Sequence, residues 1–210
     1  TFTVTAPGVL DLSLGAIGAN SSASGVVANL TGVDINPSGV FLNSANLTLP
    51  PGQQYSFAPG AFEITGGGSD IFTPPDRLRY VYATQTGDFD VMVKVPYQDS
   101  VRLSGKAGIE VRVSLDQSAP QVLASVNPMW PARQLYEGTV RQVQNGASVS
   151  WGAGTTVAQY PNVWLRLRRV GNAFMRYSST NGVNWQCDGQ TTTSPNMPDT
   201  VFLGLAVCSV

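Results

Sequence analysis

The sequence predicts an all-β fold, a sandwich of two antiparallel sheets with very little helix. From Gln54 onward, strand-like segments recur at short and regular intervals. Dipeptides that favour tight turns, such as Asn145-Gly146, separate them. No window keeps the apolar i, i+3, i+4, i+7 stripe of a helix for three turns. Because 210 residues suit one β-sandwich, we interpret 1–210 as a single domain.

The expected strands are apolar and β-branched runs bounded by Gly, Pro, Asn or Asp. They are 55–65, 77–84, 89–96, 106–115, 121–127, 134–144, 163–170, 173–179, 183–187 and 201–208. Thr86-Gly87-Asp88, Gly171-Asn172 and Asn181-Gly182 suit hairpin turns, because Gly and Asn tolerate positive φ. Residues 163–187 are therefore expected to form a three-stranded meander.

Alternation within three of these strands separates an apolar face from a polar face. The polar sets are Asp90, Met92 and Lys94; Lys106, Gly108, Glu110 and Arg112; and Trp164, Arg166 and Arg168. Two mid-strand arginines cannot enter a core without costly desolvation. We therefore expect Trp164, Arg166 and Arg168 to point outward, while Val163, Leu165 and Leu167 are buried.

The first third of the chain has a different composition, because every Lys and Arg lies at or after Arg77. Short apolar bursts there alternate with Gly, Ser, Asn and Pro, which is typical of short strands and long loops. We interpret 24–53 as a low-charge insertion or long-loop region. Asn20, Asn29 and Asn46 each begin a glycosylation triplet, and the sequence leaves open whether they are modified.

Charge content bears on location and partners. Charged residues make up 12% of the chain, about half of the usual ~25%. A surface built from uncharged polar residues is typical of secreted, periplasmic or cell-surface proteins, so we expect an extracytoplasmic location. The net charge of -1 argues against nucleic acid as a partner. No apolar run reaches the ~18 residues of a membrane span. The first residue is Thr1, and we expect a processed chain or a fragment.

The two cysteines, Cys187 and Cys208, both lie in strand-like segments near the end of the chain. In an oxidising compartment they would close a loop of about twenty residues. An antiparallel sheet can bring two such strands together, so we expect a disulfide. The alternative is two buried free thiols.

From about Pro59 onward, a series of motifs occurs in a characteristic order. They are Gly66-Gly67-Gly68-Ser69-Asp70-Ile71, Leu78-Arg79-Tyr80-Val81-Tyr82, Gly87-Asp88-Phe89-Asp90, Lys106-Ala107-Gly108-Ile109-Glu110-Val111-Arg112, Trp164-Leu165-Arg166-Leu167, Ser179-Thr180-Asn181-Gly182-Val183-Asn184-Trp185 and Gly204-Leu205-Ala206-Val207. This part of the chain resembles bacterial domains of unknown function in the concanavalin A-like lectin/glucanase superfamily. The resemblance implies a concanavalin A-like jelly-roll sandwich and an accessory binding role more than a reaction.

The residues argue against catalysis. The chain contains no His, which removes the commonest general base. Hydrolytic members of the wider superfamily carry an E-x-D-x-E arrangement of carboxylates, which is missing here. The nearest approximations are Asp88-x-Asp90 and Glu110, and we expect Glu110 to pair with Lys106 or Arg112. A glycoside hydrolase is therefore the weakest functional alternative.

No cofactor or metal is expected. Asp34-Ile35-Asn36, Asp88-x-Asp90 and Asp99 offer oxygen ligands of the kind that calcium takes. They form no recognisable calcium loop, so solvated turn carboxylates are the preferred interpretation.

A sugar site on a sandwich needs an exposed aromatic ring flanked by hydrogen-bonding side chains. The candidate ligand-binding residues are Trp164, Arg166, Arg168, Glu110, Arg112, Asp90, Tyr136 and Trp151, whereas Trp185 is assigned to the core. We therefore expect a non-catalytic module that binds glycan through an exposed sheet face. The alternative is an accessory or structural subunit that docks another protein in a larger envelope or cell-surface assembly, because Arg and Trp are enriched at interface hot spots.

Overall fold

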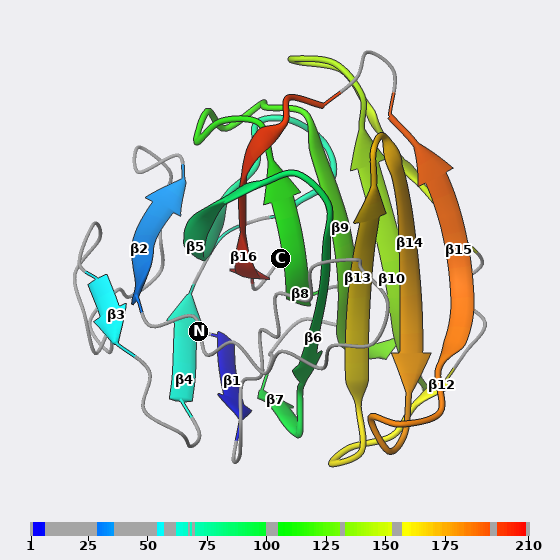
Figure 1. The fold of residues 1–210 in the computed structure, drawn as a ribbon. Coiled ribbons are helices and arrows are strands. Elements are labelled where there is room, and N and C mark those ends of the chain that lie inside the picture. The colour runs from blue at the N-terminus through cyan, green and yellow to red at the C-terminus, as the bar shows by residue number, and fades with distance from the viewer. Residues whose placement is uncertain are drawn as a thin grey trace.

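The computed structural model describes residues 2–6, 29–35, 54–56, 62–66, 68, 70–99, 105–130, 133–152, 157–193 and 197–208. Every regular element in these ranges is a strand, and two large antiparallel sheets pack together (Figure 1). The prediction of an all-β sandwich is therefore confirmed. The described residues include no helix with the length and apolar character of a membrane span.

One layer is a four-stranded sheet, whose strands lie side by side in Figure 1. Its order is β15 (Gln186–Thr192), β14 (Ala173–Ser179), β13 (Trp164–Val170) and β6 (Phe89–Lys94). Gly171 and Gly182 adopt positive φ in the two connections between β13, β14 and β15. The expected meander is confirmed, although its third strand begins at Gln186 rather than Val183.

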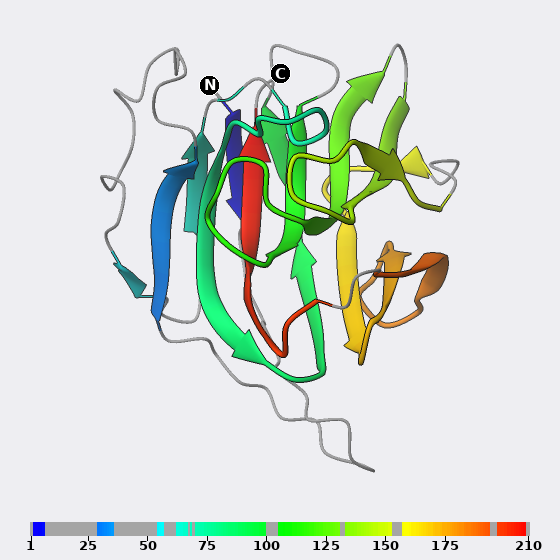
Figure 2. The same cartoon turned by 90° about the horizontal axis from the view of Figure 1, so that it is seen from above.

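The other layer is a nine-stranded sheet. Its main path is β11 (Ser148–Ser150), β10 (Arg133–Arg141), β9 (Gln121–Trp130), β8 (Lys106–Arg112), β16 (Thr200–Cys208), β5 (Leu78–Thr86), β2 (Asn29–Ile35) and β3 (Gln54–Ser56), with β12 (Val157–Ala158) paired to β10. The late strand β16, red in Figure 2, thus lies inside the sheet between β5 and β8. Strand β2 falls within the region 24–53 and pairs with β5.

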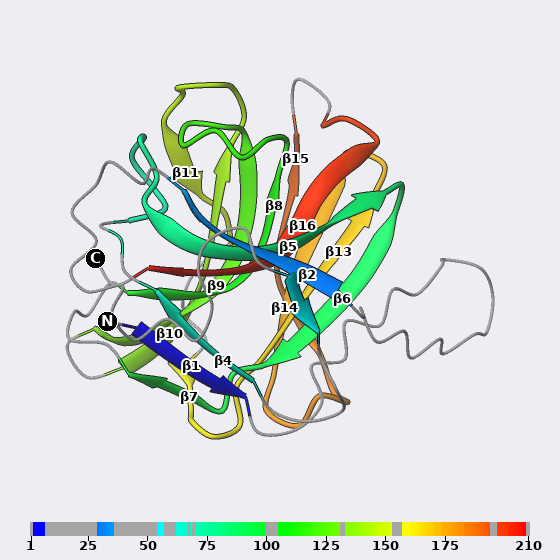
Figure 3. The same ribbon diagram turned by 90° about the vertical axis from the view of Figure 1, so that its left-hand side faces the viewer.

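A small third sheet consists of β4 (Phe62–Gly66), β1 (Phe2–Ala6) and β7 (Tyr97–Asp99). Its strands are grouped together in Figure 3. Strand β1 is the central one and pairs antiparallel with both neighbours.

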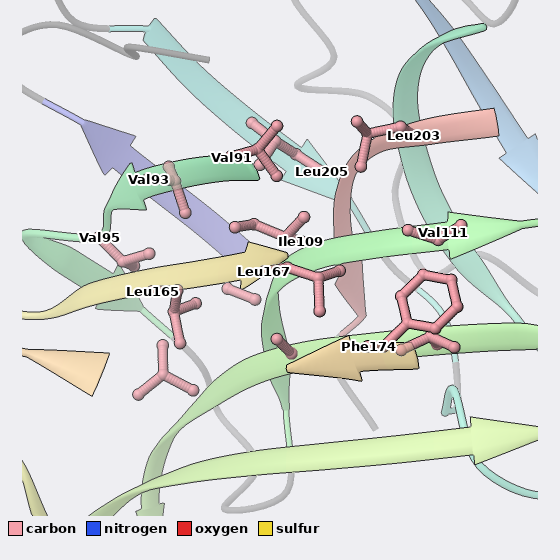
Figure 4. Packing of buried hydrophobic residues seen from close by; sticks show 14 of the residues in the cluster. Val91, Val93, Val95, Ile109, Val111, Leu165, Leu167, Phe174, Leu203 and Leu205 are labelled. Atoms are coloured by element: carbon pink, nitrogen blue, oxygen red, sulfur yellow. The ribbon is translucent and has the colours of Figure 1, made fainter. Parts of the chain in front are cut away.

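The core between the two large sheets includes the apolar faces that alternation predicted for β6, β8 and β13. Val91 of β6 and Leu165 and Leu167 of β13 belong to the same buried cluster as Ile109 and Val111 of β8 (Figure 4). All five side chains are buried. Each such side chain adds on the order of 1.5–3 kcal/mol by leaving water, so this cluster is the main attraction between the layers.

Two arginines of the four-stranded sheet also point inward. Arg169 is buried, and its guanidinium donates hydrogen bonds to the carbonyls of Met197, Pro198 and Gly171. Arg176 is buried as well, and its Nε donates to the carbonyl of Trp151. Backbone oxygens thus replace part of the water that each guanidinium loses, which lowers the cost of burial.

The outer face of the nine-stranded sheet is covered by the segments 70–77 and 113–120. A second apolar cluster lies there and contains Ile71, Leu78, Tyr80, Leu123, Ala206 and Cys208. Asp76 N donates to Gln117 O at 2.7 Å, which joins the two covering segments. This part of the sheet is therefore buried on both faces.

The predicted disulfide between Cys187 and Cys208 is wrong, because both cysteines are free. Cys187 is exposed on β15, at the edge of the four-stranded sheet. Cys208 is buried at the end of β16, inside the nine-stranded sheet. Local patterns placed both residues in strand-like segments, but these patterns do not specify which strands share a sheet.

We expect the two thiols to differ sharply in reactivity. Burial raises the pKa of Cys208 to about 12, so this thiol is both inaccessible and protonated. Without reductant, iodoacetamide should modify Cys187 alone in the folded protein and both residues in denaturant, as followed by mass spectrometry. Failure to modify either cysteine in denaturant without reductant would contradict the structure and indicate a disulfide.

Candidate functional site

The eight residues predicted to bind a ligand do not form one site. The structure divides them among three places: the outer face of the four-stranded sheet with Trp164, Arg166, Arg168 and Asp90, the covered face of the nine-stranded sheet with Glu110 and Arg112, and the core with Tyr136 and Trp151. Only the first group combines the predicted residue types with access to solvent.

Glu110 and Arg112 were expected on an exposed face, and that expectation is wrong. Both side chains are 0% exposed, because the covering segments lie over this part of β8. Arg112 Nη1 donates to Glu110 Oε1 at 2.7 Å and to Asp76 Oδ2 at 2.9 Å. The predicted pairing of Glu110 with Arg112 is therefore confirmed, but it lies inside the protein.

Asp76 links Arg112 to a second buried arginine, Arg141 of β10. Arg141 Nη1 and Nη2 each donate to the Asp76 carboxylate at 2.6 Å. The same guanidinium donates to the carbonyls of Phe72 and Ala119 at 3.1 Å. Since these carbonyls belong to the two covering segments, the charged cluster fastens both segments to the sheet and serves the fold rather than a ligand.

Tyr136 and Trp151 were expected to contribute to the binding surface, and this expectation is also wrong. Tyr136 is 1% exposed and Trp151 is 5% exposed. The Tyr136 hydroxyl donates to Ser179 O at 3.2 Å, across the two sheets, and Trp151 Nε1 donates to Leu123 O at 3.3 Å. A Cβ at Gly138 would lie 2.7 Å from Trp151 Nε1, so the missing side chain leaves room for the inward indole.

The outer face of the four-stranded sheet, here called the β13 face, is partly open to solvent. The prediction for β13 is confirmed, since Val163, Leu165 and Leu167 are buried. Trp164, Arg166 and Arg168 alternate with them and are half-buried. The side chains around Arg166 on this face are Asp90, Lys94, Trp164, Arg168, Tyr177 and Trp185. Cross-strand register sets their order, with Trp164 opposite Lys94 and Arg168 opposite Asp90.

Arg166 is the best-anchored side chain of the β13 face. Its Nε and Nη2 donate to the two oxygens of Asp90 at 2.6 and 2.5 Å. Its guanidinium carbon lies 5.2 Å from the centroid of Tyr177 and 5.6 Å from that of Trp185, within cation–π range. The hydrogen bonds that Arg166 donates to Asp90 are the first cause of the raised pKa of Arg166. One guanidinium thus fixes a carboxylate and two aromatic rings.

Trp164 lies in the neighbouring row of the sheet. The Lys94 ammonium nitrogen lies 5.7 Å from the centroid of its ring. On the β14–β15 turn, a Cβ added at Gly182 would come within 3.0 Å of the indole. Gly182 also has φ +72°, so glycine suits both the turn and the close approach to Trp164. The indole is therefore positioned by its neighbours yet remains half-exposed.

Sequence reasoning missed two aromatic members of this site. Tyr177 alternates with the buried Phe174, Arg176 and Ser178, so period-two alternation along β14 was a usable signal. Trp185 was assigned to the core, which is wrong, because it is half-buried and lies beside Arg166. It precedes the first residue of β15, where strand alternation gives no orientation.

The candidate calcium ligands are dispersed or already engaged. Asp88 Oδ1 accepts a hydrogen bond from Gly171 N at 2.6 Å, and Asp90 is held by Arg166. Within the described ranges, no group of three His, Cys, Asp or Glu residues is arranged to hold a metal ion. Asn36 lies outside the described residues, as do the triplet residues Asn20 and Asn46.

Comparison with known proteins gives one finding about fold. No protein family and no curated protein matches the sequence. Among solved structures, the chain is similar to a functionally unknown protein from Saccharomyces cerevisiae, with a TM-score of 0.55 and 17% sequence identity. The match covers 69% of this chain and 75% of the yeast chain. At this identity the likeness shows a shared fold and carries no information about activity.

The buried charge cluster predicts a large effect of Asp76→Asn. The substitution leaves Arg112 and Arg141 without their shared counter-charge in a fully buried site. Urea denaturation should show a loss of about 3–5 kcal/mol in the free energy of unfolding. The matched control is Asp199→Asn, an exposed carboxylate, which should change stability by less than about 0.5 kcal/mol. Equal effects of the two substitutions would refute the structural role of Asp76.

The same cluster predicts a pH dependence. Burial raises the pKa of Glu110 from 4.5 to about 7, although Arg112 and Arg141 oppose the shift; Asp76 adds to it. Since the folded state holds this proton more tightly than the unfolded chain, the associated stability is fully present below about pH 4.5. It is lost as pH rises through about 7.

The measurement compares urea denaturation of wild type and Glu110→Gln between about pH 5 and pH 8. Between these pH values, the free energy of unfolding of wild type should fall by on the order of 2 kcal/mol more than that of the variant. Parallel curves for the two proteins would mean that Glu110 does not titrate in this window.

Proposed function

We propose that this protein is a non-catalytic, extracytoplasmic binding module that recognises glycans with the β13 face. The observation that carries the proposal is the half-exposed group of Trp164, Tyr177 and Trp185 around the Asp90–Arg166 pair. Aromatic rings can cover the C–H face of a sugar, while carboxylate and guanidinium groups hydrogen-bond its hydroxyls. The motifs in 66–207 support the further proposal that the sandwich is of the concanavalin A-like jelly-roll type.

The site is organised before any ligand arrives. Arg166 holds Asp90 by two hydrogen bonds and lies over two rings, so these side chains have little freedom to lose on binding. Strand β13 is itself paired on both sides, to β14 and β6, which fixes the backbone beneath them. Such preorganisation lowers the entropic cost of association.

A second candidate function is docking of another protein as an accessory subunit. It is favoured by the clustering of Trp, Tyr and Arg, the residue types that dominate interface hot spots. Val183, 76% exposed on the turn that carries Gly182, would add apolar contact area. Both candidates use the same face, so the test needs a panel of glycans and a protein capture arm.

The test is a glycan array with the isolated chain, followed by titration calorimetry with the best ligand. Trp164→Ala and Trp185→Ala should each weaken binding by about 2 kcal/mol, or roughly thirtyfold in Kd. The matched control is Val149→Thr, a 54% exposed position on β11 of the other sheet, which should bind as wild type does. Thermal denaturation of each variant confirms that the fold is retained.

Unchanged affinity in both tryptophan variants would show that glycans, if bound, use another surface. Absence of glycan binding, together with capture of a protein partner that the same variants abolish, would favour the docking function instead.

A further inference from the structure

The β13 face carries an excess of positive charge. Its charged side chains among the described residues are Lys94, Arg166, Arg168 and Asp90, three cations and one carboxylate. The whole chain has 12 Lys and Arg against 13 Asp and Glu, and a net charge of -1. A local cationic surface on a slightly acidic protein favours a negatively charged ligand.

Arg168 is a cation of this face whose Nε atom lacks a hydrogen-bond partner among the described residues. Asp90 is already bound twice by Arg166, and the Arg168 Nε–Asp90 Oδ2 distance is 4.0 Å, too long for a hydrogen bond. The buried Nε atom of Arg168 has no hydrogen-bond partner in the described part of the chain. Since the side chain is 33% exposed, its guanidinium can reach an acceptor from outside.

Lys94 is the second available cation. Its ammonium group lies over the ring of Trp164, and none of the ion pairs formed between described residues includes it. Register places Lys94 in the row of Trp164, and Arg168 in the row of Asp90. These two rows are four residues apart along β6, or ~13 Å at ~3.3 Å per residue.

The aromatic side chains lie along the same face as these two cations. Arg166 and Tyr177 occupy the row between them, and Trp185 lies beside Arg166. A ligand that engages both Lys94 and Arg168 must therefore be longer than a single sugar and carry repeated negative groups. The planar fork of an arginine matches a carboxylate in a two-point contact, which distinguishes it from a neutral hydroxyl.

We propose that the β13 face binds an acidic polysaccharide of the uronic acid type. Arg168 and Lys94 pair with the carboxylates of two different sugar units. Trp164, Tyr177 and Trp185 contact the sugar rings between these two units. This inference rests on the proposed glycan-binding function and deepens it, because it assigns the chemical class of the ligand. It also assigns different roles to the two outward arginines: Arg166 positions its neighbours, and Arg168 contacts the ligand.

The test uses the full chain and calorimetric titration with oligomers of galacturonate and of alginate. Each oligomer is compared with its methyl ester, which keeps the sugar rings and removes the charge. Binding of the free acids should be at least about tenfold tighter and should weaken as salt is raised. Arg168→Gln and Lys94→Gln should each weaken it by about tenfold, whereas Arg77→Gln, a half-buried arginine beside β5 in the other layer, should have no effect.

Two outcomes separate this inference from the proposed function. If acids and esters bind equally and only Trp164→Ala lowers affinity, the acidic class is wrong and glycan binding stands. If no glycan of either charge binds, both proposals fail.

Two further ligands test the chemistry of the anion. Tighter binding of dextran sulfate than of the uronate oligomers would overturn the assignment to carboxylates. Equal binding of polyglutamate, with the same dependence on Arg168 and Lys94, would overturn the assignment to sugars, because the rings would then contribute nothing. Weak or absent binding of dextran sulfate and of polyglutamate supports the proposal.

Discussion

A carboxylate that lies between two buried guanidiniums determines how the two faces of this sandwich differ. Asp76 forms ion pairs with both Arg112 and Arg141 where none of the three side chains is exposed to solvent. Without Asp76, Arg141 would lack a carboxylate partner and Arg112 would pair with Glu110 alone, which makes burial of the two guanidiniums costly. Because Asp76 supplies this counter-charge, the segments 70–77 and 113–120 can pack on the sheet as a further layer. They thereby exclude ligands from this face.

The β13 face carries similar residue types with a different result. Asp90 and Arg166 also form a two-point ion pair, but their side chains are 20% and 26% exposed because no described segment covers them. The pair therefore stays hydrated at its margin and can exchange water for the hydroxyl groups of a ligand. The two ion pairs have similar composition and differ in whether a chain segment lies over them. The covered pair stabilises the fold, and the uncovered pair is available for binding.

Alternation along single strands predicted which residues of β13 and β8 share a face, and the structure agrees for Leu165 and Ile109 as well as for Arg166 and Glu110. It did not predict that Glu110 would be covered, because the cover comes from Asp76, thirty-four residues earlier in the chain. Strand neighbours and covering loops depend on contacts between distant segments, which local patterns do not encode. For the same reason, local patterns wrongly predicted a disulfide between Cys187 and Cys208, which lie in different sheets.

Strand β13 couples the site to the fold while keeping the two separable. Its inward Leu165 and Leu167 pack in the core, and its outward Trp164, Arg166 and Arg168 form the surface, so one backbone positions both. Truncating an inward leucine opens a cavity, whereas truncating Arg168 removes one 4.0 Å contact with Asp90. Arg166 lies between these extremes, because its loss would also release Tyr177 and Trp185. If the β13 face binds the proposed glycan, substitutions of Arg168 and Trp164 are the most informative, because they leave Arg166 in contact with Tyr177 and Trp185.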